Sequence, residues 1–357
     1  MIRAAFTIGV LFLSVAAFSA TPRKSAKQAV KKAPARQSSS VQAAAPAQSA
    51  HRRMPYVGAI SVNAATGEVL FEDNADAEAY PASVTKLMTL LLVMEDVKAG
   101  KYGFDDFVVA TAEAYRSEPS WVGIKAGEKM SVRDLCRALM VESANDAAIV
   151  LGVHAAGSFD AFVARMNARA SELGMKRTRY YNPNGLPPNA GRRYPWKSFN
   201  VSTARDQVAL ARALLRLPGV LELTSIKTCD LVKTADGFRV SVTRRANEPL
   251  RETTLAAGEK LVKQMRNHNN IMRMDRVKVL TADGKVEKVP RILNPDGKEA
   301  VDGLKTGYID AGGSSIVLTG SRKGKRAVVV VLGSSSAMMR DAKAYSLMSD
   351  ALGALVW

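Results

Sequence analysis

A serine and a lysine stand three residues apart where an apolar stretch begins, in the segment PASVTKLMTLLL (81–92). If this stretch is a helix, Ser83 and Lys86 lie on one face within reach of each other, and the helix N-terminus favours negative charge that develops near Ser83. A lysine that is desolvated and close to other cations has a lowered pKa and can hold a free amine. The pair therefore has the chemistry of a serine nucleophile with Lys86 as its base.

Two further short motifs follow along the chain, Ser143-Ala144-Asn145 and Lys305-Thr306-Gly307. Each motif is weak evidence alone. By chance, roughly one serine in fifteen has a lysine three positions later in the chain. Their combination and order are specific, because Ser-x-x-Lys opens an apolar helix and Lys-Thr-Gly precedes a strong hairpin signal. This is the motif set of penicillin-binding proteins and class A β-lactamases.

Purely structural interpretations stay open for each motif. Ser83 could serve only as a helix N-cap and Lys86 as a lysine whose stem lies along apolar surface. Ser143 and Asn145 could cap a helix junction, and Lys305 could be an exposed strand lysine. Rival catalytic sets are poorly supported: the three histidines occur in a polar tether, a helix and the run RNHNN, and no zinc-type spacing is present. We therefore expect neither a metal site nor a cofactor.

The elements that would position these motifs alternate between strands and helices. Strand patterns flank Thr66-Gly67, and a helix is expected from Ser83 to Gly100. A further helical pattern, 130–151, opens with a capping signal at Ser131 and is interrupted near 143–146. Amphipathic helices follow in FDAFVARMNARASELGM and STARDQVALARALLRL; then come strand pairs from 225 onward, a hairpin around Lys323-Gly324 and a closing helix from 337. This order predicts an α+β fold, with an antiparallel sheet built from both chain ends and flanked by helices, and a mostly helical insertion at about 100–220.

The N-terminal 53 residues differ from the rest. Residues 1–20 combine Arg3, an apolar run and small residues, as in a secretory signal peptide, although an uncleaved anchor is the alternative. Residues 21–53 are rich in Ala, Pro, Ser and basic residues and predict a disordered linker. The first 53 residues contain nine Lys/Arg and no Asp/Glu, half of the net charge of +18. This charge favours association with an anionic cell wall or membrane surface, with a merely solvated linker as the alternative; we expect no nucleic-acid partner.

Residues 54–357 are then expected to form the catalytic domain, in an extracytoplasmic setting. Two cysteines, Cys136 and Cys229, would permit one disulfide there, but Cys136 lies in an apolar helical pattern that favours a buried free thiol. The sequence leaves this choice open.

The segments PASVTKLMTLLL, SANDAA, NPNGL, STARD and VDGLKTGY resemble the serine-type D-Ala-D-Ala carboxypeptidases, which are low-molecular-weight penicillin-binding proteins. The resemblance runs from about Tyr56 to the last helix. It implies a β-lactamase/transpeptidase-like fold, a location in the periplasm or cell-wall space, peptidoglycan stem peptides as substrates and β-lactam antibiotics as inhibitors.

The resemblance also implies roles for single residues. Ser83 would attack the penultimate D-alanine carbonyl, Lys86 would accept the serine proton, and Ser143 would relay a proton to the leaving amine. Asn145 would hold the substrate amide, and Gly307 would let the substrate backbone pack close to the edge strand. The terminal carboxylate would be bound by Lys305, Thr306 and Arg340. The backbone N–H groups of Ser83 and Tyr308 would form the oxyanion hole.

Three departures leave the substrate preference open: the insertion PPNAGRRYPWKSFN, about thirty residues between HNNIMR and VDGLKTG, and Ile309 in place of a common threonine. A D,D-endopeptidase that cleaves cross-links is therefore the main alternative. A β-lactamase is less favoured because no Glu-x-x-Leu-Asn stretch supplies a deacylating glutamate, and a non-catalytic wall-binding protein is disfavoured by the intact motifs. Some relatives append a β-rich domain and an amphipathic anchoring helix; since this sequence stops at Trp357, we expect that mode of attachment to be missing.

Overall fold

The computed structural model describes residues 55–113, 119–188, 198–280, 283 and 285–355. All of them belong to one compact unit, Pro46–Trp357. The predicted signal peptide (1–20) and basic linker (21–53) lie outside the described residues, and these two assignments remain predictions.

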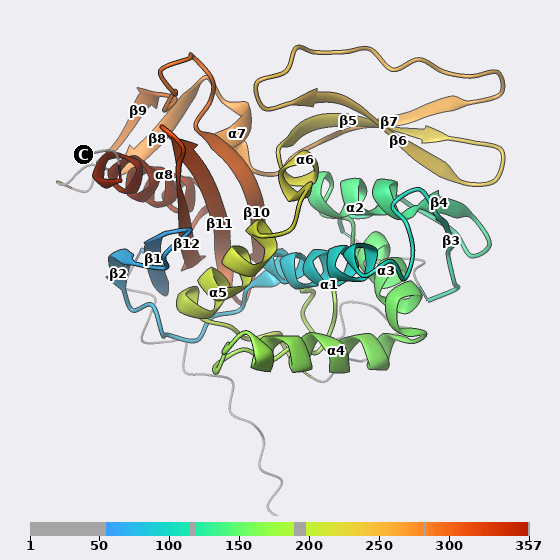
Figure 1. The fold of residues 1–357 in the computed structure, drawn as a ribbon, viewed down its shortest axis with the longest axis horizontal. Coiled ribbons are helices and arrows are strands. Elements are labelled where there is room, and N and C mark those ends of the chain that lie inside the picture. The colour runs from blue at the N-terminus through green and yellow to red at the C-terminus, as the bar shows by residue number, and fades with distance from the viewer. Residues whose placement is uncertain (1–54, 114–118, 189–197, 281–282, 284, 356–357) are drawn as a thin grey trace, which may run out of the picture. The chain divides into compact units, whose positions relative to one another are not determined.

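A five-stranded antiparallel sheet joins the two ends of this unit, as predicted (Figure 1). Its strand order is β10-β11-β12-β1-β2, with the bounds β1 Gly58–Asn63, β2 Val69–Asp73, β10 Val301–Ile309, β11 Gly313–Arg322 and β12 Lys325–Ser334. β11 and β12 form the hairpin expected around Lys323-Gly324. Because β10 stands at the edge of the sheet, one side of its backbone is left without a strand partner within the sheet.

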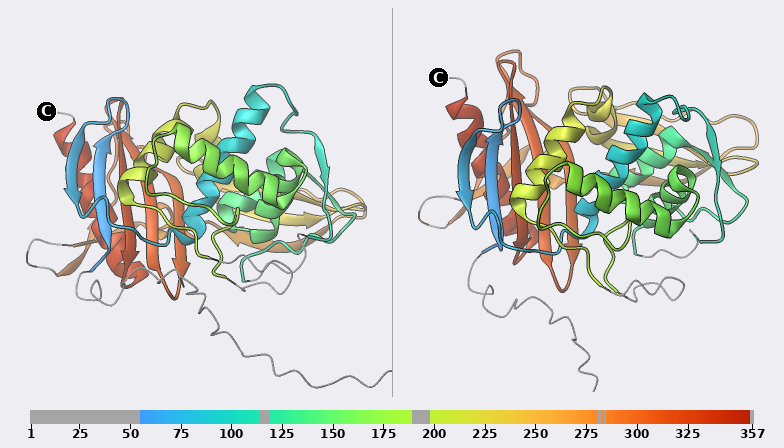
Figure 2. Two further views of the ribbon diagram at one scale, coloured as in Figure 1. Left: turned by 90° about the horizontal axis from the view of Figure 1, so that it is seen from below. Right: turned by 60° about the horizontal axis from the view of Figure 1, so that its bottom comes forward.

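Both faces of this sheet are covered, which explains its nearly continuous apolar central strands. Residues Ile316 and Val329 pack with α8 (Ala337–Ala354) in one core cluster. Their neighbours Val317 and Val328 belong to a second core with the helical segment. Alternate residues of a strand therefore serve different cores. Both views of Figure 2 show α8 and the helical segment on opposite sides of the sheet.

The helical segment lies between β2 and β5 in the chain. Its helices are α1 Lys86–Lys98, α2 Val132–Val141, α3 Asn145–Ala156, α4 Phe159–Glu172, α5 Ala204–Leu215 and α6 Val220–Thr224; the short strands β3 Phe107–Val109 and β4 Lys129–Ser131 pair beside them. The predicted cap of α2 is confirmed, since Ser131 Oγ accepts the Asp134 N–H at 3.1 Å. The predicted interruption is also confirmed, because α2 ends at Val141 and α3 begins at Asn145.

The strands after residue 225 do not all join the central sheet. β5 Ile226–Lys233, β6 Phe238–Arg245 and β7 Lys260–Arg266 form a separate sheet of order β6-β5-β7, while β8 Arg276–Leu280 and β9 Val286–Pro290 form a two-stranded ribbon after the short helix α7 Asn270–Arg273. Cys229 and Leu231 of β5 are buried in the core shared with α2, which holds this sheet against the helices.

Cys136 and Cys229 are both buried and both free, so the thiol interpretation is confirmed over a disulfide.

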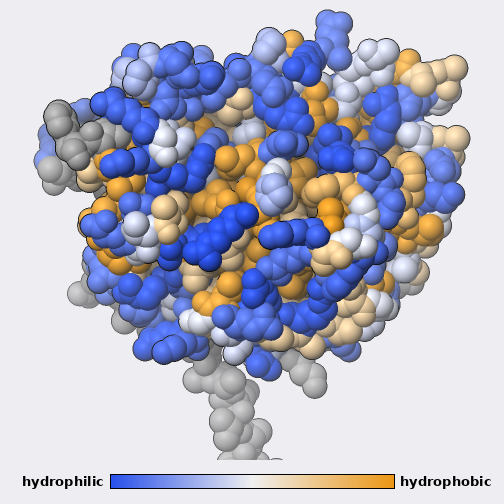
Figure 3. Space-filling view, viewed as in Figure 1, coloured by the Kyte–Doolittle hydropathy of each residue, from blue (hydrophilic) through white to orange (hydrophobic). Residues whose placement is uncertain are grey.

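Among the described residues, no single helix is both long and apolar enough to cross a membrane; α3 and α4 meet such a test only together, as a pair bent by 85°. On the face seen in Figure 1, apolar residues gather near the centre and hydrophilic residues surround them (Figure 3).

Candidate active site

Ser83 lies in a 3₁₀ turn, Ala82–Thr85, that leads directly into α1. The expected helix therefore starts its α-helical part at Lys86 rather than at Ser83. No side chain caps this turn or α1. The Ser83 hydroxyl instead contacts Lys86 Nζ at 2.8 Å. Ser83 is thus a partner of the lysine and not a helix cap.

Lys86 is completely buried and its Nζ has three oxygen neighbours. These are Ser83 Oγ at 2.8 Å, Asn145 Oδ1 at 2.8 Å and the Asn184 carbonyl at 2.7 Å. Burial and the nearby charge of Lys305 hold the pKa of Lys86 well below its ordinary value, against a smaller opposing effect of Asp146. A neutral amine can donate to the two carbonyl oxygens and accept the Ser83 proton, which is the arrangement that a base requires.

The loop Asn182–Leu186 supplies one of these acceptors. Asn182 Oδ1 accepts the Gly185 N–H at 2.6 Å and shapes the turn. Gly185 has φ +85°, and a Cβ there would lie 1.9 Å from the Ala82 carbonyl oxygen, so only glycine fits. The loop therefore packs directly on the Ser83 turn. The sequence analysis quoted NPNGL only for the family resemblance and did not predict that Asn184 contacts Lys86. A Pro/Asn/Gly-rich loop between helices was the one sequence signal that pointed to this contact.

Ser143 lies in the break between α2 and α3, and Asn145 is the first residue of α3. The Ser143 backbone has φ +59°, and among the described residues its buried Oγ has no hydrogen-bond partner. The α3 N-cap is Ala144, with no side-chain cap bond, so the helix-capping interpretation fails. Asp146, which the sequence analysis also missed, is buried and accepts the Gly123 N–H at 2.8 Å. Burial raises the pKa of Asp146, although its backbone N–H partners oppose this shift. Its carboxylate ties a loop to the start of α3.

Lys305 and Thr306 lie on β10 with 2% and 5% of their surface exposed, so Lys305 is not an ordinary exposed strand lysine. Lys305 Nζ donates to the Thr306 carbonyl at 2.9 Å. Burial, and secondly the charge of Arg340, lower the pKa of Lys305 to about 7. A Cβ at Gly307 would lie 2.5 Å from the Pro81 carbonyl oxygen and 3.0 Å from Ser83 N. The glycine therefore lets β10 approach the Ser83 turn, a packing role that the sequence analysis did not foresee.

Tyr308 and Arg340 are placed differently. The Tyr308 side chain is 62% exposed and its hydroxyl donates to Asp310 at 2.8 Å, so only its backbone continues the strand beside Ser83. Arg340 lies on α8 with 4% exposure, and its charge acts on Lys305. The predicted residues thus come from the Ala82–Thr85 turn and α1, from the junction of α2 and α3, from β10 and from α8, and the Tyr308 side chain is turned to solvent.

His268 is a further residue near this site that the sequence analysis set aside. It follows β7, and it is exposed at the surface. Even so, partial burial, then the charges of Lys305 and Lys86, lower the pKa of His268 to about 4. The imidazole is therefore neutral at physiological pH. Nothing in the run RNHNN signalled its position, because the contact arises from the β7–α7 connection.

Comparisons with known proteins identify the family of this chain. A family model described as D-alanyl-D-alanine carboxypeptidase (peptidase S11) matches residues 47–260, more than half of the chain. D-alanyl-D-alanine carboxypeptidase DacF of Bacillus subtilis is 32% identical over 166 residues, 46% of this chain and 40% of the relative. This chain thus matches about two fifths of that relative's length.

Solved structures extend the similarity over most of the chain. D-alanyl-D-alanine carboxypeptidase DacD of Francisella tularensis has a TM-score of 0.66 at 28% identity, covering 83% of this chain and 70% of that one. Penicillin-binding protein D2 of Listeria monocytogenes, solved in an ampicillin-bound form, has a TM-score of 0.59 at 27% identity, covering 83% of this chain and 97% of that one. The predicted transpeptidase-like fold is confirmed, and this chain belongs to the D-alanyl-D-alanine carboxypeptidase family.

Proposed function

We propose that this protein is a serine D,D-carboxypeptidase that removes the terminal D-alanine from peptidoglycan stem peptides through a Ser83 ester. One observation carries the proposal: Lys86 Nζ lies 2.8 Å from Ser83 Oγ in a fully buried position. The lowered pKa of Lys86 supports its role as the base. Family membership supports the substrate class.

The reaction begins when the Lys86 amine accepts the Ser83 proton and Ser83 Oγ attacks the penultimate D-alanine carbonyl. The backbone N–H groups of Ser83 and Tyr308 stabilise the oxyanion. Ser143 gives its hydroxyl proton to the leaving amine and regains a proton from the Lys86 ammonium, the C–N bond breaks, and D-alanine departs. Lys86, neutral again, takes a proton from water as the water adds to the ester carbonyl; the bond to Ser83 Oγ breaks, that proton passes to Ser83, and the shortened stem peptide is released. The unpartnered, buried Ser143 Oγ supports this relay, because it has no competing hydrogen bond among the described residues.

The substrate carboxylate is held by positive charge from two elements, Lys305 with Thr306 on β10 and Arg340 on α8. The low exposure of Lys305 and Arg340, 2% and 4%, strengthens charge recognition because little water screens it. Asn145, already bonded to Lys86 through Oδ1, orients the substrate amide beside the base. Specificity for a free terminal carboxylate follows from this arrangement.

β-Lactams acylate the same Ser83 oxygen, and the resulting acyl-enzyme is hydrolysed slowly. The ampicillin-bound relative supports this by analogy. We further propose residues 1–20 as a signal peptide, 21–53 as a basic linker that associates with an anionic wall or membrane surface, and 54–357 as the catalytic domain. These assignments place the enzyme in the periplasm or cell-wall space.

A labelled penicillin tests the proposal directly. The purified protein is incubated with the label and the modified peptide is mapped by mass spectrometry. We expect label on Ser83 and none on the Ser83→Ala variant, while Ser335→Ala, an exposed serine on the β12–α8 connection, serves as the matched control and labels like the wild type. Label on another residue, or on Ser83→Ala, contradicts the mechanism.

Muropeptide digestion separates the activities. Loss of one D-alanine from monomeric stem peptides supports the carboxypeptidase, whereas cleavage of cross-linked dimers with intact monomers supports the endopeptidase alternative. Rapid nitrocefin hydrolysis would instead indicate a β-lactamase. Unchanged activity in Ser83→Ala would indicate a non-catalytic role for the motif.

A further inference from the structure

Arg340 has a carboxylate partner to which the proposed mechanism gives no role, its neighbour Asp341. Arg340 Nε donates to Asp341 Oδ1 at 2.8 Å, and Nη2 lies 2.6 Å from the same oxygen. Consecutive residues of a helix do not face each other, so this contact requires the guanidinium to turn along α8 toward Asp341. The two side chains are only 5% and 11% exposed, so little water competes with the pair. Asp341 therefore sets the position of the Arg340 guanidinium.

The pair leaves one nitrogen of Arg340 available for a ligand. Among the described residues, Arg340 Nη1 makes no hydrogen bond or ion pair, because both contacts to Asp341 use Nε and Nη2. The charge of Arg340 acts on Lys305, whose Nζ donates within the described chain only to the Thr306 carbonyl. Two cations with unused N–H groups thus lie near each other, one on α8 and one on β10. One carboxylate can accept from both of them.

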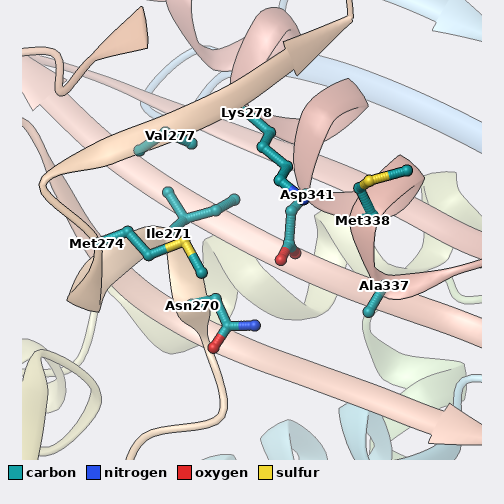
Figure 4. Close-up of a pocket in the computed structure, with 8 residues that line it drawn as sticks. All are labelled: Asn270, Ile271, Met274, Val277, Lys278, Ala337, Met338 and Asp341. Carbon is teal, nitrogen blue, oxygen red and sulfur yellow. The ribbon is translucent and has the colours of Figure 1, made fainter. Parts of the chain in front are cut away.

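The short helix α7 holds Asp341 from its other side. The Asn270 side chain forms a hydrogen bond to Asp341, and Asn270 Oδ1 accepts from Arg273 Nη2. Because its oxygen is engaged by Arg273, the Asn270 amide has its nitrogen left to donate to the carboxylate. Figure 4 shows the Asp341 carboxylate directed toward Asn270, with the amide nitrogen on the nearer side. A chain of hydrogen bonds therefore leads from α7 through Asp341 to Arg340.

The charge of Asp341 also makes the empty site less costly. Asp341 is buried, and burial raises the pKa of its carboxyl, while Arg340 on α8, Lys278 on β8 and Asn270 on α7 oppose this shift. In its charged form Asp341 offsets the burial of Arg340 beside Lys305. A buried charge that has lost its partner is strongly destabilising. Without Asp341, the cations of the site would have no nearby anion until substrate binds.

We propose that Asp341 is a positioning residue for recognition of the substrate's terminal carboxylate: it fixes Arg340 so that Nη1 is free for that carboxylate, and Asn270 holds Asp341 in place. This inference rests on the proposed function for the role of Arg340. The alternative is that Asp341 only links α7 to α8. The two roles differ in whether the loss caused by a substitution depends on the carboxylate of the ligand.

The test compares acylation of Ser83 by benzylpenicillin and by its methyl ester. The acid carries a carboxylate beside the β-lactam amide, and the ester lacks this charge. We expect Asp341→Asn to slow acylation by the acid about tenfold, because an oriented, charge-assisted hydrogen bond is lost, and to leave the rate with the ester unchanged. Asp341→Glu keeps the carboxylate and should recover part of the rate. Asp350→Asn, an exposed aspartate on the same helix, is the matched control and should change neither rate.

A double variant shows whether Asp341 acts through Arg340. We expect Arg340→Gln and the double variant Arg340→Gln/Asp341→Asn to be acylated by the acid at the same rate, since Asp341 then has no arginine left to position. Losses that multiply contradict the inference. If Asp341→Asn does not fold, as judged by circular dichroism, Asn270→Ala carries the test because it keeps the Arg340 pair. It should slow the acid about threefold and leave the ester unchanged.

These results keep the two proposals apart. If the wild-type protein is not acylated at Ser83, or reacts with acid and ester at equal rates, the proposed function or its carboxylate site fails. If the wild type prefers the acid but folded Asp341→Asn slows both ligands equally, or slows neither, the positioning role alone fails. An unchanged ratio of acid to ester in Asn270→Ala rejects the hold from α7.

Discussion

The two buried lysines of the site are held in different ways. Lys86 is surrounded by acceptors from three separate segments, at 2.7 to 2.8 Å. Lys305 lies on a regular edge strand, and among the described residues its Nζ has one acceptor, the Thr306 carbonyl at 2.9 Å. Both have lowered pKa values, yet only Lys86 has its hydrogen-bonding capacity filled by the protein.

This difference matches the two tasks. A general base must be held beside the proton that it removes and must not move when substrate binds. The surrounding hydrogen-bond partners hold the Lys86 amine in that position. A carboxylate-binding lysine must keep N–H groups for the ligand, so a single backbone partner suffices. The contrast can be tested at each lysine separately.

Replacing Lys86 with methionine should have the largest effect. Lys86→Met keeps the length of the side chain but removes the base, so we expect the penicillin acylation rate to fall about 10⁴-fold. Stopped-flow acylation measures the rate, and Lys98→Met, at the exposed end of α1, is the matched control. Acylation at a normal rate by folded Lys86→Met protein would show that Lys86 is not the base.

Gly307→Ala tests how closely β10 must approach the Ser83 turn. The added Cβ would meet the Pro81 carbonyl oxygen at 2.5 Å, so the strand and the turn must separate. We expect kcat/KM to fall about 10²-fold, because small displacements of reacting groups are costly. Gly353→Ala in α8, where a Cβ meets nothing within 4 Å, is the control. Equal activity of both variants would remove the packing role of Gly307.

The pH dependence separates the lysines without disturbing Lys86. A lysine with a lowered pKa is protonated below that pKa and loses its charge above it. Since the pKa of Lys305 is about 7, kcat/KM of the free protein should fall as pH rises through this value. Arg340→Gln removes a nearby cation and raises the pKa of Lys305, so the alkaline limb should move to higher pH while kcat/KM at its optimum falls about tenfold.

A pH profile from 5 to 10 checks this, with Arg216→Gln, an exposed arginine after α5, as the control. An alkaline limb that stays in place, or moves to lower pH, contradicts the coupling between Arg340 and Lys305.

The smallest effect is expected in the scaffold behind Lys86. Thr85 Oγ1 accepts from Asn200 Nδ2 at 3.0 Å, and the same amide donates to the Asn182 carbonyl at 3.0 Å. Thr85→Val removes one of these bonds and should lower the free energy of unfolding by about 1 kcal/mol. Urea unfolding measures it. A loss of activity beyond about tenfold with unchanged stability would place Thr85 in the chemistry rather than in the scaffold.

The sequence by itself determined the catalytic candidates and most of the secondary structure. Ser83 and Lys86 are one helical turn apart, so their proximity follows from local geometry. The cap at Ser131, the hairpin at Lys323-Gly324 and the break near 143–146 follow from local patterns in the same way.

Only the tertiary structure decided which remote groups complete the site. Asn184 reaches Lys86 across 98 positions of the chain, and the neutral His268 arrives from the strand connection after β7. The placement of β5–β7 in their own sheet and the packing of Gly307 on the Ser83 turn were likewise not foreseen. Such contacts depend on packing between segments that are far apart in the chain. The sequence pattern shows which side of a helix or strand is apolar, but it does not show which other element packs against that side.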